Sequence, residues 1–197
     1  MRRKLIPSPL EYHPDVAPVR HPLLPVVAER GGTELRTPKP VVIVDTREQN
    51  PFSFARFHGW FAAVEHKALK VGDYSIKGLE QLCTVERKDL PDLITSFTSN
   101  RAVFVKRLRQ MSQFPHRLLV VTASLSEVKS SYAHTGASPN KITQSLIAAL
   151  AGLGLPFLCV DTHHLGEEIV ASYLYQVHLY HWLEQNDHGR HIADGDL

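Results

Sequence analysis

The chain has 197 residues, which is enough for one domain with appendages and a full hydrophobic core. Its 22 Lys and Arg residues against 20 Asp and Glu residues give a formal net charge of only +2, so any basic surface for nucleic acid must come from local clustering. Two cysteines exclude a disulfide framework and a zinc-finger spacing. The longest apolar stretch, residues 146–160, is broken by glycines and a proline and is too short to span a bilayer.

The N-terminal residues 1–39 are expected to form a proline-rich, flexible arm. Residues 1–40 contain eight of the 13 prolines and show no sustained hydrophobic period. The chain starts as Met1-Arg2-Arg3-Lys4 but breaks into prolines where a secretory signal would continue as an apolar run. The arm is basic and either touches the DNA backbone or is a tether. We expect a cytoplasmic protein (nucleoid-associated in a prokaryote) that is not secreted and has no membrane partner.

A single α/β domain is expected over residues 40–185. Residues 41–44 are a continuous β-branched run, typical of a strand buried on both faces, and the run ends at Asp45. A loop with aromatic anchors follows at 51–60, and Asp89 is expected to cap a helix, with Asp92 as capping partner. Further strands are expected around 66–71, 74–76, 82–88, 118–121 and 157–160, and helices at 89–97, 101–114, 139–153 (with Ser138 as N-cap) and 166–184. Residues 186–197 are expected to fray.

Three acids and a lysine stand at the ends of these strands or within them. In a strand over 85–88, side chains alternate, so Glu86 and Lys88 share one face while Arg87 points to the other. Asp45 ends a buried strand, and Asp73 follows a glycine that allows a tight turn or a close backbone approach. Hard oxygen ligands of this kind suit Mg²⁺ or Mn²⁺. Lys88 beside them would orient a metal-bound water, help to deprotonate it, or offset the charge that develops on phosphorus.

Three sequence blocks together resemble the nuclease domain of the XPF family of structure-selective DNA endonucleases, over roughly residues 40–185. They are Asp45-Thr46-Arg47-Glu48, Gly72-Asp73-Tyr74 and Glu86-Arg87-Lys88-x-x-x-Asp92. The resemblance implies a restriction-endonuclease-like α/β core, with a mixed central sheet flanked by helices. It also implies Mg²⁺-dependent cleavage, with Mn²⁺ as a substitute, of one DNA strand near a duplex/single-strand junction such as a flap or fork, in DNA repair or recombination.

The same resemblance implies roles for individual residues. Asp45, Asp73 and Glu86 match the metal-binding acids, and Lys88 matches the catalytic lysine. Further active-site positions are matched by Arg47, Glu48, Arg87 and Asp92. Two of these residues have a plainer alternative: Asp92 as a helix-capping residue only, and Arg87 as half of a structural salt bridge.

The resemblance also raises the question of partners. Family members usually carry a tandem helix-hairpin-helix module after the nuclease domain, and the residues after 185 are too few to form one. We therefore expect targeting by the arm or by a separate protein. A homodimer through the nuclease domain is implied by resemblance, with Ile169, Tyr173, Val177 and Tyr180 as a seam, although the same side chains could instead pack on the sheet.

Basic residues of the expected helix at 101–114 are candidates for DNA backbone contacts beside the site. These are Arg101, Lys106, Arg107 and Arg109. Basic side chains on a helix are as often simply solvated.

Two other functions compete with a nuclease. One is a DNA-binding scaffold built on a catalytically inactive nuclease fold, which would have no need to keep the acids and Lys88 together. The other is a small-molecule phosphohydrolase, which would not explain the basic helix or arm.

Overall fold

The computed structural model describes residues 27–28, 34–35, 37–133 and 135–186. Its main feature is a six-stranded sheet with the strand order β4-β3-β5-β6-β7-β8. β3–β4, β6–β7 and β7–β8 are parallel pairs, whereas β3–β5 and β5–β6 are antiparallel. The expected mixed sheet is confirmed. The strands are β3 (Val41–Val44), β4 (Ala63–His66), β5 (Tyr74–Ile76), β6 (Cys83–Lys88), β7 (His116–Val121) and β8 (Phe157–Cys159).

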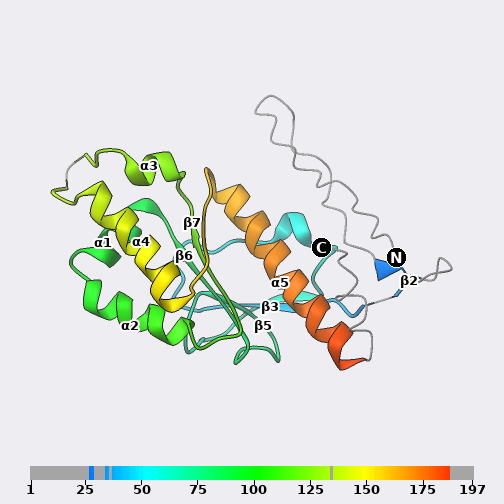
Figure 1. Cartoon of the computed structure of the whole chain (residues 1–197). Coiled ribbons are helices and arrows are strands. Elements are labelled where there is room, and N and C mark those ends of the chain that lie inside the picture. The colour runs from blue at the N-terminus through cyan, green and yellow to red at the C-terminus, as the bar shows by residue number, and fades with distance from the viewer. Residues whose placement is uncertain (1–26, 29–33, 36, 134, 187–197) are drawn as a thin grey trace.

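Helices cover both faces of the sheet (Figure 1). The alternation of side chains along β7 shows how: Leu118 and Val120 enter a core cluster with the last helix, and Leu119 and Val121 enter a second cluster with the other helices. One face carries α1 (Leu90–Phe97), α2 (Arg101–Met111), α3 (Leu125–Lys129) and α4 (Pro139–Leu153), and the other carries α5 (His163–Gln185).

The loop before β4 completes the core on the α5 side. Phe52, Phe54 and Phe57 are each at most 1% exposed, and the short 3-10 helix η1 (Ala55–Phe57) lies within the loop. The Tyr74 hydroxyl accepts a hydrogen bond of 3.0 Å from the Phe52 backbone N–H. The expected aromatic anchors are therefore confirmed, and they fix this loop beside the start of β5.

Sheet topology determines where the three sequence blocks meet. Because β3 and β6 both run antiparallel to β5, their C-terminal ends lie at the same edge of the sheet as the N-terminal end of β5. Asp45 follows β3, Asp73 precedes β5, and Lys88 ends β6. Residues far apart in the sequence are thus brought to one sheet edge.

The structure differs from the sequence-based expectations at one strand and adds one helix. The strand expected at 66–71 is β4 at 63–66, and residues 67–73 instead form a loop that is held at the sheet edge. Helix α3 was not expected, although Ser124 and Glu127 form a full capping box at its start. Ser138 is the N-cap of α4 and Pro139 is the first residue of the helix, as expected, although the Ser138 side chain makes no capping hydrogen bond.

The four α5 side chains proposed as a dimer seam contact the sheet. Val177 is 4% exposed within the core, and Ile169, Tyr173 and Tyr180 pack against the same cluster. These last three side chains are only partly buried, so packing on the sheet leaves part of each exposed and the dimer seam stays a prediction. No helix in the described part of the chain is both long and apolar enough to cross a membrane.

Most of the expected arm at 1–39 lies outside the described residues, so its flexibility stays a prediction, but two short strands within it are described. β1 (Val27–Ala28) and β2 (Glu34–Leu35) pair antiparallel with each other and form a sheet separate from the main one. After them, the Thr37 and Tyr175 hydroxyls lie 3.3 Å apart, and the Pro38 carbonyl lies 2.8 Å from His178 Nε2. The expectation for residues 187–197 lies outside the described residues.

Deleting residues 1–35 is expected to leave the domain folded. The deletion removes β1 and β2, which are not part of the six-stranded sheet, and it keeps the contacts of Thr37 and Pro38 with α5. We expect the melting temperature to change by less than about 3 °C, equivalent to at most about 1 kcal/mol for a domain of this size. Thermal unfolding followed by circular dichroism measures this, and a drop of about 10 °C would show that the arm is part of the core.

Candidate active site

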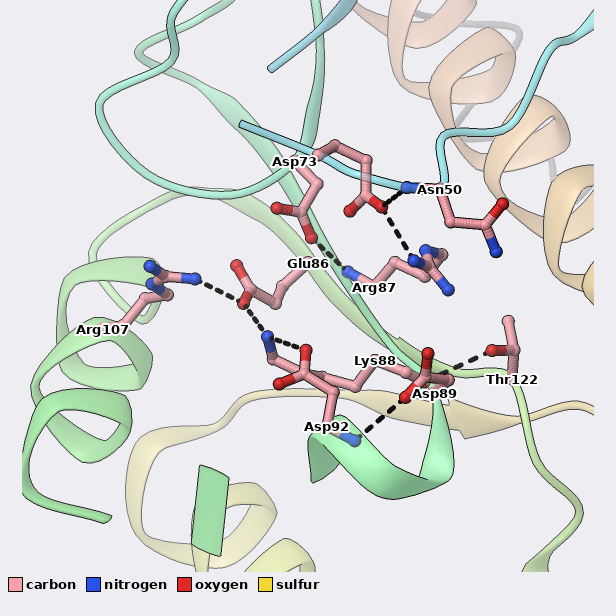
Figure 2. Close-up of polar contacts among 10 residues, drawn as sticks. Asn50, Asp73, Glu86, Arg87, Lys88, Asp89, Asp92, Arg107 and Thr122 are labelled. Carbon is pink, nitrogen blue, oxygen red and sulfur yellow. Dashed lines mark hydrogen bonds and ion pairs between the residues drawn. The ribbon is translucent and has the colours of Figure 1, made fainter. Parts of the chain in front are cut away.

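The predicted catalytic residues line one cleft of about 560 Å³ at the edge of the sheet. Lys70, Arg107 and the N-terminal turn of α1 also contribute to its wall. The eighth predicted residue, Glu86, has no exposed surface and lies among the residues of the cleft (Figure 2). The seven that line the cleft are Asp45, Arg47, Glu48, Asp73, Arg87, Lys88 and Asp92.

Glu86 and Lys88 share one face of β6, as expected from strand alternation. Lys88 Nζ lies 3.1 Å from Glu86 Oε1 and donates a hydrogen bond of 2.7 Å to Asp92 Oδ2 on α1 (Figure 2). It also lies 5.5 Å from the centre of the Phe104 ring. Burial alone lowers the pKa of Lys88, but Glu86 and Asp92 outweigh burial and raise that pKa. Lys88 is therefore a firmly held cation at neutral pH.

Asp73 faces Glu86 from the neighbouring strand (Figure 2). Its Oδ2 accepts a hydrogen bond of 2.7 Å from the Arg87 backbone N–H. Burial, followed by the nearby Glu86 carboxylate, raises the pKa of Asp73 to about 8. Two neighbouring, largely buried carboxylates repel each other, so the pair favours a proton or a cation between them.

Gly72 makes this placement of Asp73 possible. Its φ is +81°, and a Cβ there would lie 2.2 Å from Thr84 Oγ1 and 2.9 Å from the Val85 carbonyl oxygen. Backbone hydrogen bonds on both sides of Asp73 then lock its position, from Asp73 N to Val85 O at 2.7 Å and from Asp45 N to Asp73 O at 2.8 Å. Only glycine satisfies both the left-handed backbone and the close approach to β6.

Arg87 lies on the opposite face of β6 and forms a buried ion pair. Its Nη2 donates a hydrogen bond of 2.8 Å to Glu48 Oε1, and each of these side chains is 7% exposed. The same Glu48 oxygen accepts from the Asn50 backbone N–H at 2.8 Å, and Arg87 lies 5.9 Å from the centre of the Phe52 ring. This pair fastens the loop after β3 to β6, so the plainer alternative for Arg87, a structural salt bridge, is present in the structure.

Asp45 is 2% exposed and both of its oxygens are occupied by donors. Oδ1 accepts from Arg47 N and Nε, each at 2.8 Å, and Oδ2 accepts from Arg47 Nη2 at 2.9 Å and Leu69 N at 2.6 Å. Arg47 Nη2 also donates to the Leu69 carbonyl at 2.6 Å. Burial raises the pKa of Asp45, but these hydrogen bonds outweigh it and lower the pKa overall. Asp45 and Arg47 together clamp the loop of residues 67–73.

Asp45→Asn is expected to loosen this loop. The side-chain NH2 group of the new asparagine cannot accept a hydrogen bond, so donors of Arg47 or Leu69 would lose their acceptor. A buried donor without an acceptor lowers the free energy of unfolding by about 1–3 kcal/mol. We expect a lower melting temperature together with near-normal Mn²⁺ affinity, measured by calorimetry on the same sample. Normal thermal stability with Mn²⁺ affinity lost as fully as in Asp73→Asn would instead make Asp45 a direct ligand.

The Asp92 side chain faces the active-site lysine and does not take the capping role that the sequence left as the alternative. The Asp89 side chain caps α1 and accepts a hydrogen bond of 2.9 Å from the Asp92 backbone N–H, which confirms Asp89 as N-cap. The Asp92 carboxylate does not return to the Asp89 backbone but points to Lys88 (Figure 2). The capped helix therefore aims this carboxylate at the lysine.

The four basic residues of α2 have different surroundings. Arg107 lines the cleft, and its Nη1 donates a hydrogen bond of 2.8 Å to Glu86 Oε1. Arg101 Nη1 instead donates to Ser145 Oγ at 2.9 Å and packs over Phe97, away from the cleft lining. Lys106 and Arg109 are exposed and do not line the cleft. Of the expected strip, only Arg107 lines the cleft, and contact of the four residues with DNA stays a prediction.

Several residues that line the cleft were missed by the sequence analysis. Lys70 lies in the loop that was expected to be a strand, and its position two residues before Gly72 was the available signal. Gln49 and Asn50 follow the first sequence block directly, and Thr95 lies one turn beyond Asp92 on α1. Proximity in sequence to a recognised block could have identified each of them.

The residues of the cleft fit a divalent cation with few protein ligands. Among the described residues, no group of three or more His, Cys, Asp and Glu side chains could hold a metal ion, and both oxygens of Asp45 already accept hydrogen bonds, so a metal role for Asp45 stays a prediction. Glu86 Oε2, however, is buried without a hydrogen-bond partner, beside an Asp73 whose pKa is raised. Mg²⁺ commonly takes one or two carboxylates and completes its shell with water and phosphate oxygens, which agrees with this pair.

The fold and the cleft define a class of protein: an α/β domain with a restriction-endonuclease-like core and acids and a lysine at one sheet edge. The ERCC4 domain model matches residues 44–173, which is more than half of the chain. The chain therefore belongs to the ERCC4/XPF nuclease domain family. No curated protein is significantly similar to it in sequence.

Solved structures agree with this fold. XPF from Aeropyrum pernix is 17% identical, with a TM-score of 0.55 over 70% of this chain and 65% of that chain. The same protein in complex with DNA is 18% identical, with a TM-score of 0.53 over 71% of this chain and 64% of that chain. The chain thus spans slightly less than two thirds of the length of these structures.

Proposed function

We propose that the protein is a metal-dependent DNA endonuclease that hydrolyses phosphodiester bonds near duplex/single-strand junctions, in DNA repair or recombination. Membership of the ERCC4/XPF nuclease family supports the chemistry, and a structural relative described as a complex with DNA supports the substrate class. The predictions of a homodimer and of a separate targeting protein stay predictions.

One observation carries the proposal: the neighbouring carboxylates of Asp73 and Glu86 destabilise the folded protein, which is expected only where they have a catalytic use. Glu86 is fully buried with Oε2 unpartnered, and the pKa of Asp73 is raised to about 8. Unpaired buried polar atoms and like charges in contact both destabilise a fold. A protein that only binds DNA would gain from replacing Asp73, which forms no ion pair among the described residues, so its retention beside Glu86 and Lys88 favours an enzyme over a scaffold.

The residues then divide the work as follows. Asp73 and Glu86 would hold Mg²⁺ or Mn²⁺, which polarises the scissile phosphate and lowers the pKa of a bound water. Lys88 stays charged and is placed to offset the charge that develops on the phosphoryl oxygens. Asp92 orients Lys88, and Glu48 with Arg87 fixes the loop after β3 against β6. Asp45 and Arg47 position the loop that delivers Asp73.

A cleavage assay tests the proposal. End-labelled flap, fork, single-stranded and duplex DNA are incubated with the full chain in Mg²⁺, Mn²⁺ or EDTA. We expect cuts near the junction of the flap and fork that need a metal and are lost in Asp73→Asn. Binding of DNA without cleavage under every metal would overturn the enzyme in favour of the scaffold.

A further inference from the structure

We infer that the substrate strand continues out of the active-site cleft into a second hollow beside it, where its phosphates are held by Lys70 and a group of glutamines. This inference rests on the proposed function. The hollow has a volume of about 360 Å³ and lies between the loop before β5 and the C-terminal end of α2. Its lining residues are Lys70, Val71, Gln81, Gln110, Gln113 and Phe114.

The two hollows share one residue pair in their walls. Lys70 and Val71 line both the active-site cleft and the second hollow. Lys70 is exposed and forms no ion pair with any residue that the structure describes, whereas the cations on either side of Glu86 are engaged with it. A free ammonium group therefore stands where a strand leaving the cleft would pass.

The chemistry of the second hollow suits a phosphate backbone. Its polar side chains are one ammonium group and three primary amides, and no acid lines it. Lysine and glutamine side chains are common donors to phosphate oxygens, and such contacts set register without reading sequence. The active-site cleft, by contrast, is lined by several acids, which repel phosphate groups. A DNA strand that passes through the cleft therefore needs hydrogen-bond donors to its phosphates outside the cleft.

The backbone on both sides of the hollow is held in place. On one side, Leu69 is clamped by Asp45 and Arg47, and the Val71 carbonyl accepts a hydrogen bond of 3.0 Å from Thr84 Oγ1. On the other side, Gln110 lies one helical turn after Arg107, which places both on one face of α2.

The turn after α2 is fixed by hydrogen bonds from Gln113 N to Gln110 O at 3.2 Å and from Phe114 N to Met111 O at 2.9 Å. The donors therefore extend from Arg107 at the cleft to Gln110 and Gln113 in the hollow, on a backbone that is already ordered.

The test compares Lys70→Ala and the double variant Gln110→Ala/Gln113→Ala with two matched controls, Lys129→Ala on α3 and Gln144→Ala on α4. Both control side chains are exposed and line neither hollow. All variants are made in the full chain with Asp73→Asn, so that the substrate is not cut. Binding of fluorescein-labelled flap DNA is measured by anisotropy over a range of salt concentrations, and circular dichroism verifies folding.

We expect Lys70→Ala to raise Kd about three- to tenfold and to reduce the slope of log K against log salt by about 0.7–0.9, the value for one lost phosphate contact. The glutamine double variant should raise Kd similarly without changing the slope, because it removes no charge. Phosphate ethylation interference should lose signals on one side of the scissile phosphate in both variants.

Two results would overturn the inference, and they are distinguishable. Variants that bind like the controls, in a protein whose wild type binds and cleaves DNA, would remove the second hollow from the substrate path and leave the nuclease intact. A wild type that does not bind DNA would overturn both.

Discussion

Asp73→Asn is expected to abolish cleavage, by roughly 10³-fold or more, while DNA affinity changes by less than about threefold. Under the proposed function, the substitution removes one of the two carboxylates that would hold the metal, and a metal contributes several kcal/mol to charge stabilisation in phosphoryl chemistry. DNA affinity would come mainly from phosphate contacts made by basic and amide side chains, which the substitution leaves in place. Single-turnover cleavage and anisotropy titration on the same flap DNA give the two quantities. A parallel loss of binding would show that Asp73 has another role.

The same variant has a second readout, in the absence of metal. The pKa of Asp73 is about 8 in the folded protein, compared with 3.8 for an ordinary aspartate. Between about pH 4 and pH 8 the folded protein therefore keeps a proton on Asp73 that the unfolded chain has released. Native stability therefore falls as pH rises from about 4 to about 8, by at most about 1.4 kcal/mol per pH unit. In Asp73→Asn the free energy of unfolding should not decrease in this way, because the amide has no proton to lose.

In EDTA, the melting temperature of Asp73→Asn should accordingly exceed that of the wild type by more at pH 8 than at pH 5. The exposed Asp161→Asn serves as the matched control and should track the wild type at both pH values. A difference between Asp73→Asn and wild type that does not change with pH would contradict the buried acid pair.

Lys88→Ala is expected to lower the turnover rate by roughly 10²- to 10³-fold, the range for removing one preorganised charge-stabilising group. Metal affinity should be unchanged or tighter, because the substitution removes a cation that lies 3.1 Å from Glu86. Cleavage rates at saturating Mn²⁺ and Mn²⁺ binding by calorimetry separate the two effects. A large rise in the metal requirement would contradict this role.

Lys88→Arg is the informative companion, since it keeps the charge but not the geometry. The Glu86 and Asp92 carboxylates raise the pKa of Lys88, so its charge is present throughout the neutral range. We expect partial activity in Lys88→Arg and a wild-type pH profile between pH 6 and 9. If Lys88 were the general base instead, Lys88→Arg would be as inactive as Lys88→Ala.

The clamp of Asp45 and Arg47 changes how the first sequence block is understood. By resemblance, Asp45 matches a metal-binding acid, yet its oxygens accept four hydrogen bonds from Arg47 and Leu69. We propose that this residue acts through the loop it holds, which carries both Lys70 and Asp73. Asp45→Asn separates the two roles, because only positioning predicts lower stability with retained metal affinity.

The sequence by itself determined the elements whose local signals agree with their tertiary surroundings. The β-branched run of β3, the period-2 alternation of β6 and the Asp89 cap of α1 were all predicted, because each has a local sequence signal that agrees with its place in the fold. The sharing of one strand face by Glu86 and Lys88 follows from that alternation alone. The motif-bearing blocks also sufficed to indicate the family.

Only the tertiary structure decided how the polar groups pair. Whether Arg107 faces Glu86 and Arg101 faces Ser145 depends on how α2 packs, which no local pattern encodes. The loop at 67–73 resembles a strand in composition, but the Asp45 carboxylate satisfies the Leu69 N–H in place of a neighbouring strand. Lys70 and the glutamines come together for the same reason: long-range packing, rather than spacing along the chain, determines which side chains share a surface.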